Sequence, residues 1–445
     1  MFILHSLLDK LKEEFANSRK GEERGLWFVY TLMAFIIPFT SSKTSNVLRC
    51  LRTLFGYTDI SRRRFYTFMA SPKIPWTRLW PRLWKMIPAP LTDGRLIVAL
   101  DDSINPKTGK KIFGCQHIFD HAAKHNQSKY PWAQNIVAIG LLKKIKGRWA
   151  CLPLSFRFYF LKKHLERYTV KLGKNEVKFQ NKFAQSANML LELSKVFKGA
   201  SILTVADSWF GNKGLWKPLR KKLGAQFHML SRLRVNSNMF DLPPIITGSK
   251  KVGRPRKYGD KLGNAKSLAS KYQQSAQEYE VHLYGKTRTV MAYDRVVMLK
   301  NLQCPVRVVW VFRETQWVAI FCTDLSLTVE QIVEYYAARW KIESGFKELK
   351  QDIGSAETQT RNPFAVTNHL HFCMMASTLT WIYASRLKKT PRRRHSVQGR
   401  RHFAFSDVRR LMAREILHDN FAILFPAPRK ALFNSFATAL LRMAA

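Results

Sequence analysis

The sequence predicts an α/β fold, and three observations support this prediction. Two short apolar runs, at 95–102 and 201–207, end in acidic residues, which is typical of buried strands that deliver side chains to one edge of a sheet. Helical periodicity lies on both sides of the second run, so strand, helix and strand alternate along the chain. Between 279 and 322, valine-rich segments alternate in polarity, which predicts an antiparallel β insertion.

The chain has 445 residues, of which 46% are hydrophobic, so it can bury a large core in about two to four structural units. Changes in composition predict five segments. These are a helical segment at 1–90, the first part of an α/β core at 91–230, a β-rich insertion at 231–322, the second part of the core at 323–388, and a basic linker with C-terminal helices at 389–445.

The charge balance points to a polyanionic partner. Lys and Arg number 75 against 30 Asp and Glu, a formal net charge of +45, and nucleic acid is the leading candidate. A basic protein of the membrane surface is the alternative. It would need a long apolar span, but the longest apolar run, at 26–37, stops at Pro38, short of about 20 residues. We therefore expect no membrane association.

The six cysteines are widely scattered and form no C-x-x-C pair, so they predict neither a disulfide framework nor a zinc ribbon. The N-terminus lacks the features of a secretory signal. We therefore expect the chain to stay in a reducing cytoplasm.

The segment at 1–90 is expected to be a helical DNA-binding domain. Residues 44–55 and 61–66 resemble a helix-turn-helix, with arginines opening the second helix where phosphates or bases can be met. A basic helical hairpin with no such role remains the alternative. A second basic stretch carries Arg254 and Arg256 beside Gly and Pro, like a hook that enters the minor groove; a flexible basic loop is its alternative.

Strands are also expected at 135–142 and 149–158, after a turn at 105–110, which gives a three-stranded meander with the first apolar run. Between this turn and the strand at 135–142, three histidines are spaced at i, i+4 and i+8, namely His117, His121 and His125. They would form a metal-binding face if this segment were helical. No acid or cysteine completes a zinc set at a fitting spacing, and contact with phosphate is an equal alternative.

A charged helix is expected at 335–350, started by a capping box at 328–331. At about 3.6 residues per turn, one sector of roughly 60° holds four polar residues, with Lys347 just beside it. The four are Tyr336, Arg339, Glu343 and Lys350. An ordinary solvated helix with salt bridges is the alternative. The functional interpretation requires acids at the strand ends that join Glu343 to hold a divalent metal.

These four residues match the signature Y-x2-R-x3-E-x6-K at every spacing, and the chain thereby resembles the DDE transposases of bacterial insertion sequences. The resemblance extends from about 96 to 361. It implies a ribonuclease-H-like catalytic core, interrupted by the β insertion. It also implies a catalytic, metal-binding triad of Asp102, Asp207 and Glu343.

Asp101 and Asp102 are adjacent, and neighbouring strand residues face opposite sides, so only one should reach the metal. We choose Asp102, because family members place the acid directly before Ser or Thr. For Asp207, the cap of a following helix is a structural alternative. The resemblance further implies two Mg²⁺ ions, for which Mn²⁺ can substitute, and DNA contacts from the signature residues. Lys347 is added to these contacts for its place beside them.

The function implied is cut-and-paste transposition. The protein would bind the ends of its mobile element, cleave them, and join the 3′-hydroxyls to target DNA. It would act as a homodimer on DNA. Its expected location is the cytoplasm of a bacterium, in association with the nucleoid. Two alternatives stay open: a related nuclease of the ribonuclease H fold, and a domesticated DNA-binding protein without catalysis. Short inverted repeats flanking the gene would decide the class.

Overall fold

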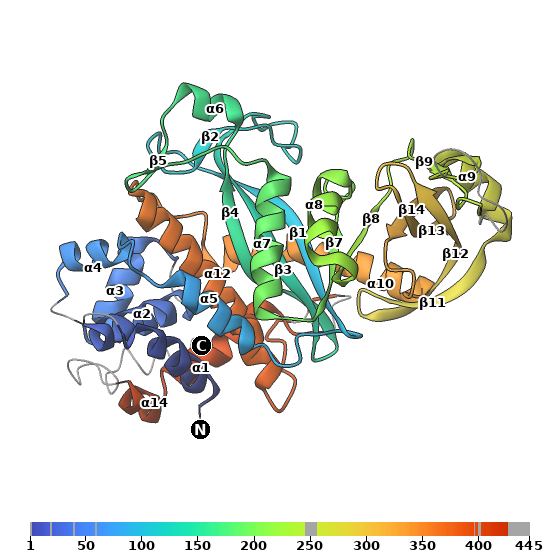
Figure 1. Cartoon of the computed structure of the whole chain (residues 1–445). Helices are drawn as coiled ribbons and strands as arrows, with labels where there is room; N and C mark the ends of the chain where they lie inside the picture. Colours follow the sequence, from blue (N-terminus) through green and yellow to red (C-terminus); the bar gives the residue numbers. More distant parts are fainter. Residues whose placement is uncertain are drawn as a thin grey trace.

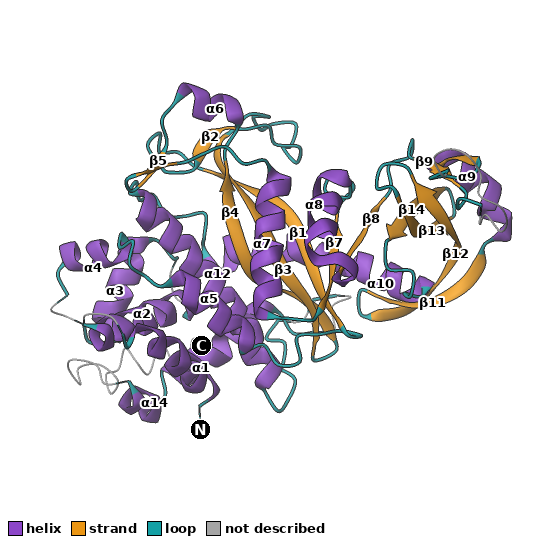
Figure 2. Ribbon diagram, in the orientation of Figure 1, coloured by secondary structure: helices purple, strands orange, loops and turns teal. Residues whose placement is uncertain are grey.

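A computed structural model describes residues 2–17, 20–38, 41–57, 60–244, 256–395, 397–398 and 402–425. Three regions lie in a row: N-terminal helices, a central sheet with helices on its faces, and a β-rich region at the far end (Figure 1). Coloured by secondary structure, the helices gather at one end and the strands at the other (Figure 2). No helix of the described part is long and apolar enough to cross a membrane.

The predicted N-terminal helices are present. They are α1 (Ile3–Lys12), η1 (Glu13–Phe15), α2 (Gly21–Ile36), α3 (Thr44–Leu54), α4 (Arg62–Met69) and α5 (Trp76–Lys85). They pack against the long apolar helix α12 (Pro363–Arg386) and against α13 (Phe405–Ile416), and their core continues into that of the central sheet. In the possible helix-turn-helix, Ser61 caps α4, which presents exposed arginines in its first turn.

The central sheet contains the predicted meander. Strands β1 (Arg95–Pro106), β3 (Trp132–Ile145) and β4 (Arg148–Tyr159) are antiparallel neighbours. On the other side of β1 lie β7 (Ser201–Ala206) and β8 (Phe227–Arg232), both parallel to it. The order is therefore β4-β3-β1-β7-β8. Helix α7 (Lys182–Val196) precedes β7 in the chain, and α8 (Lys213–Leu223) connects β7 to β8.

Side chains of β1 alternate between two hydrophobic clusters, one on each face of the sheet. Leu96, Val98 and Leu100 belong to the cluster that includes α7. Ile97 and Ala99 belong to the cluster of α10 (Val329–Ala338) and α11 (Trp340–Lys347). Both faces are buried, which is why the run reads as continuously apolar. Because β1 runs on to Pro106, the turn expected at 105–110 begins two residues later than predicted.

The insertion is antiparallel, as predicted, and it extends the central sheet instead of forming a separate one. Its elements are β9 (Asn238–Phe240), β10 (Lys261–Asn264), α9 (Ala265–Tyr272), η3 (Gln273–Ser275), β11 (Gln277–Leu283), β12 (Lys286–Leu299), β13 (Cys304–Arg313) and β14 (Gln316–Cys322). Strand β14 pairs with β8. The insertion is thereby fixed to the core beside the end of β8.

The charged helix begins at the predicted capping box on Thr328, but it is not one regular helix. It changes from α10 to α11 at Arg339 and continues as the π-helix η4 (Glu348–Ile353), which ends at Gly354 with a φ of 88°. The π-helical turn displaces Lys350 from the regular wheel on which it was placed. The remaining elements are β2 (Cys115–His117), α6 (Lys162–Arg167), β5 (Lys171–Leu172), β6 (Asn175–Glu176), η2 (Gly224–Gln226) and α14 (Asp419–Leu424).

Candidate active site

Asp101 and Asp207 lie side by side at the end of the parallel strand pair. The register of β1 and β7 ends with Leu100 opposite Ala206, and these two acids come next on their strands. Asp101 continues the face of Ile97 and Ala99, which is the α11 face. The structure here differs from the choice of Asp102, because alternation along β1 turns Asp102 toward α7.

Arg339 connects Asp101 to Glu343. Its guanidinium donates to Asp101 Oδ2 at 3.4 Å and to Glu343 Oε1 at 2.9 Å. The arginine is buried, whereas the side chain of Glu343 is 36% exposed. The three acids therefore share one face of the sheet, and Arg339 lies between Asp101 and Glu343.

The surroundings of Asp101 disfavour a negative charge. Burial raises the pKa of this carboxyl to about 7, and the nearby charges of Asp207 and Asp102 act in the same direction. The backbone N–H of Asp102, which donates to Asp101 at 2.8 Å, and the Arg339 guanidinium lower the pKa without compensating in full. Such a group of like charges calls for further positive charge.

Asp207 has a structural role as well. Its Oδ1 accepts the backbone N–H groups of Trp209 and Phe210, each at 3.0 Å, which fixes the turn after β7. The helix cap considered as the alternative for Asp207 is wrong, because Asn212 is the N-cap of α8. The turn after β7 uses one carboxylate oxygen of Asp207, and the other accepts no hydrogen bond from the described residues. The two roles are therefore compatible.

Asp102 lies in a different environment on the opposite face. Its Oδ2 accepts from Lys182 Nζ at 2.8 Å and from Asn135 Nδ2 at 2.7 Å. Lys182 also lies over the rings of Tyr159 and Trp209. Asp102 thus has a cation and an amide donor of its own, unlike Asp101.

The other signature residues surround the site unequally. Tyr336 and Arg339 line a hollow of about 370 Å³ that the insertion helps to form with Trp317. Lys350 Nζ donates to the Ile104 carbonyl at 2.8 Å, and burial lowers its pKa. Lys347 is exposed and lines another hollow, one that does not include Glu343.

The remaining predicted residues do not join this site. Arg254 lies outside the described residues, and Arg256 is exposed in the insertion. The helical histidine face is wrong, because His117 ends strand β2 and His121 and His125 lie in turns. Sequence spacing alone could not distinguish this loop from a helix.

The chemistry of the donors suits Mg²⁺, which prefers carboxylate oxygens. Within the part of the chain that the structure describes, however, no three His, Cys, Asp or Glu side chains are close enough to hold a metal ion. Asp101 and Asp207 are adjacent, whereas Glu343 is paired with Arg339. The set therefore fits in type and in face, and its third member has a competing partner.

A comparison with models of known protein families identifies the family of this chain. The model of the DDE superfamily endonuclease family matches residues 22–296, more than half of the sequence. The chain belongs to this family of nucleases. The match includes Asp101, Asp102 and Asp207 and ends before the signature residues, which it does not test.

A search of curated proteins gives no match. Among solved structures, the chain is similar to the NurA nuclease from Sulfolobus solfataricus, with 11% identity over 63% of this chain and 86% of that chain. The TM-score of 0.23 is too low to support an argument about fold or function.

Proposed function

We propose that this member of the DDE superfamily endonucleases is a DNA transposase with a ribonuclease-H-like core. The support is the strand order β4-β3-β1-β7-β8, with three antiparallel strands followed by two parallel ones. The β insertion lies between Asp207 and Glu343 in the chain, as in the transposases that the signature resembles.

The observation that carries the proposal is the convergence of Asp101, Asp207 and Glu343 on one face of the sheet. We assign the triad to these residues, with Asp101 in place of Asp102. They would hold divalent metal, with Mg²⁺ favoured and Mn²⁺ as a substitute. A pair of such ions activates the attacking oxygen and stabilises the leaving oxygen of a phosphodiester.

Arg339 has a second role in this proposal. A guanidinium binds phosphate in the same forked geometry as carboxylate. When a DNA phosphate reaches the site, Arg339 exchanges Glu343 for that phosphate, and the Glu343 carboxylate becomes available as the third ligand. Lys350 and Tyr336 position the same DNA. The Glu343 carboxylate would therefore be paired with Arg339 in the DNA-free protein and bound to metal in the DNA-bound protein.

The family match directly supports an endonuclease. The reaction products would distinguish a transposase from an endonuclease that only cleaves. A transposase cleaves the ends of its element and joins the 3′-hydroxyls to target DNA, and a homodimer would handle two ends together. An endonuclease of the same family would cleave without joining.

The test uses the DNA that flanks the gene. Fragments that carry its terminal repeats are incubated with protein, Mg²⁺ and a supercoiled plasmid, beside Glu343→Gln and beside fragments with scrambled ends. Joined products that require Mg²⁺ and intact ends are expected. Cleavage without joining would favour the endonuclease. Binding without cleavage in either metal would favour a DNA-binding protein without catalysis.

A further inference from the structure

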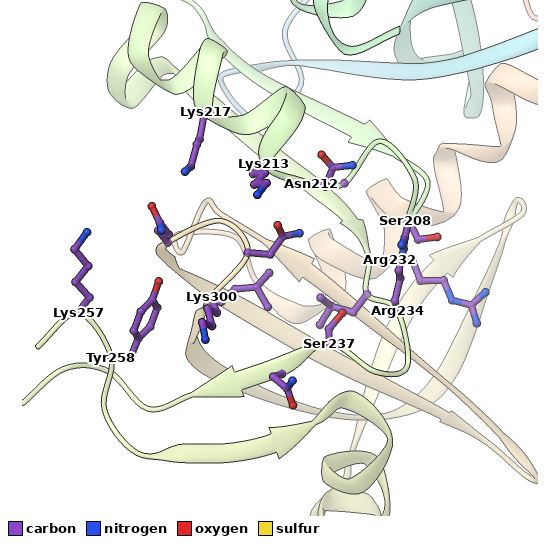
Figure 3. Close-up of a pocket in the computed structure, with 16 residues that line it drawn as sticks. Ser208, Asn212, Lys213, Lys217, Arg232, Arg234, Ser237, Lys257, Tyr258 and Lys300 are labelled. Carbon is purple, nitrogen blue, oxygen red and sulfur yellow. The ribbon is translucent and has the colours of Figure 1, made fainter. Parts of the chain in front are cut away.

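A basic hollow lies next to the proposed active site, between the core and the insertion (Figure 3). Its volume is about 780 Å³. We call it the basic hollow after its six cationic residues, Lys213, Lys217, Arg232, Arg234, Lys257 and Lys300. Among the described residues that line it, none is Asp or Glu.

The cations come from four separate parts of the chain. Lys213 and Lys217 project from α8 toward the space, and Lys257 and Lys300 lie across from them on the insertion (Figure 3). Arg232 ends β8, so it lies where core and insertion join. These cations are far apart in the sequence and come together only in the folded protein. The basic hollow therefore differs from a run of consecutive basic residues.

The six cations of the basic hollow have no acidic partner in the described part of the chain. All six side chains belong to exposed residues, and none makes an ion pair with any residue that the structure describes. Asp241, the acid on the nearby β9 side, is already paired with Arg295 at 2.5 Å. Clustered like charges repel one another, so an anionic ligand is the natural complement.

The basic hollow adjoins the catalytic face. Ser208, which lines it, directly follows Asp207. Arg232 also lines the smaller hollow of Tyr336 and Arg339, and its charge opposes the rise in the Tyr336 pKa that burial causes. The two hollows therefore share Arg232, which links the cations of the basic hollow to the hollow of Arg339.

We infer that the basic hollow binds the phosphate backbone of duplex DNA immediately beside the phosphate that is cleaved. One phosphate group would occupy a small part of the volume and contact two or three of the cations. Consecutive phosphates of a DNA strand match both the size and the spread of charge. This inference rests on the proposed function, because it takes the DNA at Asp101 and Asp207 as its starting point.

The test compares two triple variants of the full chain that remove equal charge. One is Lys213→Ala, Lys217→Ala and Lys300→Ala, within the basic hollow. The control is Lys221→Ala, Lys222→Ala and Lys271→Ala, at exposed lysines outside it, two of them on the same helix α8. Affinity for terminal duplex DNA is measured in EDTA at several salt concentrations.

Loss of three phosphate contacts should lower the slope of log K against log salt by about 2.7 in the first variant, since each contact contributes about 0.9. The control should keep the wild-type slope. Ethylation interference should show that the phosphates lost adjoin the cleavage site. Equal slopes for both variants, or lost contacts far from that site, would overturn the inference.

Wild-type cleavage in Mg²⁺, followed in parallel, separates this inference from the proposed function. If wild type cleaves and both triple variants bind alike, the transposase proposal stands and the basic hollow is not its DNA site. If wild type fails to cleave while only the first variant loses its slope, the hollow binds DNA and the proposed chemistry is overturned. Thermal melts that match wild type exclude misfolding as the cause of either result.

Discussion

On the α11 face of the central sheet, Asp101 lies beside Asp207 and shares one arginine with Glu343. On the α7 face, its neighbour Asp102 has Lys182 and Asn135 as partners. The first arrangement leaves negative charge in excess, and the second balances it. The difference shows that the two acids are not interchangeable, although one peptide bond separates them. Under the proposed function, a bound metal cation would neutralise the first arrangement, whereas the second needs no further charge.

The strongest way to break this comparison is to exchange the two acids. Asp101→Asn should reduce Mg²⁺-dependent cleavage by about 10³-fold or more, because a lost metal ligand removes several kcal/mol of transition-state stabilisation. Asp102→Asn should retain most activity. Both variants keep the shape of the side chain, so each is the control for the other. Rates are measured on pre-bound terminal DNA.

An inactive Asp102→Asn beside an active Asp101→Asn would restore the assignment predicted from the sequence. It would also mean that Lys182 leaves Asp102 when DNA and metal bind.

The sequence predicts much of this architecture. The meander, the strand-helix-strand units, the antiparallel insertion and the capping box on Thr328 follow from periodicity and local chemistry. The side to which Asp101 points does not. Residues 96–100 are apolar at every position, so the pattern cannot tell which helix covers which face. The packing of β1 against α7 on one face and against α10 and α11 on the other, contacts between distant segments, resolves it.

The helix of Glu343 shows a similar limit. A regular wheel places Lys347 and Lys350 near Glu343, but the change of helix type after Lys347 displaces Lys350 from that wheel. Nothing in the local sequence forces this π-helical turn, which ends where Gly354 adopts a left-handed conformation. The local sequence does not predict the basic hollow either, because its six cations come from four segments that meet only in the folded protein.

A second carboxylate on this helix sharpens the contrast between charge kept for chemistry and charge that lowers stability. Burial raises the pKa of Glu348 to about 7, while Arg148 acts in the opposite direction. The folded state therefore holds a proton that the unfolded chain releases near its ordinary pKa of 4.5. The free energy of unfolding should fall by up to about 3 kcal/mol as the pH rises from about 4.5 to 7, and change little above that.

Glu348→Gln should remove this fall and make the variant more stable than wild type at pH 8. Urea unfolding at pH 5 and pH 8 measures the effect, with Glu314→Gln in an exposed turn as the matched control. The same pH dependence in Glu348→Gln as in wild type would assign it to other groups.

Arg339 and Lys350 test whether the cations of the α11 face serve DNA or only the protein. If they position phosphate, Arg339→Ala and Lys350→Ala should each raise the cleavage barrier by about 1.5–3 kcal/mol, the range for a charge-assisted hydrogen bond. Lys347→Ala, whose lysine lines a different hollow, should have a smaller effect. Single-turnover cleavage beside a thermal melt makes the measurement.

If Arg339 only paired with Asp101 and Glu343 within the protein, its removal would leave these carboxylates without their cation and lower the melting temperature, while cleavage by the folded protein would hardly change. That outcome would show that this cation mainly supports the fold.

The smallest expected effect lies on the α7 face, where the pair of Lys182 and Asp102 should stabilise the fold without serving the chemistry. Their side chains are 18% and 22% exposed, so the pair is partly screened and their coupling should be about 1 kcal/mol. Lys182→Met keeps the apolar stem against Tyr159 and Trp209 and removes only the charge. A double-mutant cycle with Asp102→Asn, followed by urea unfolding, isolates the interaction.

Cleavage by Lys182→Met should stay within a few-fold of wild type, since the lysine faces away from Asp101 and Glu343. A large loss of cleavage with unchanged stability would mean that both faces of the strand take part in catalysis, and the contrast between the two aspartates would fail.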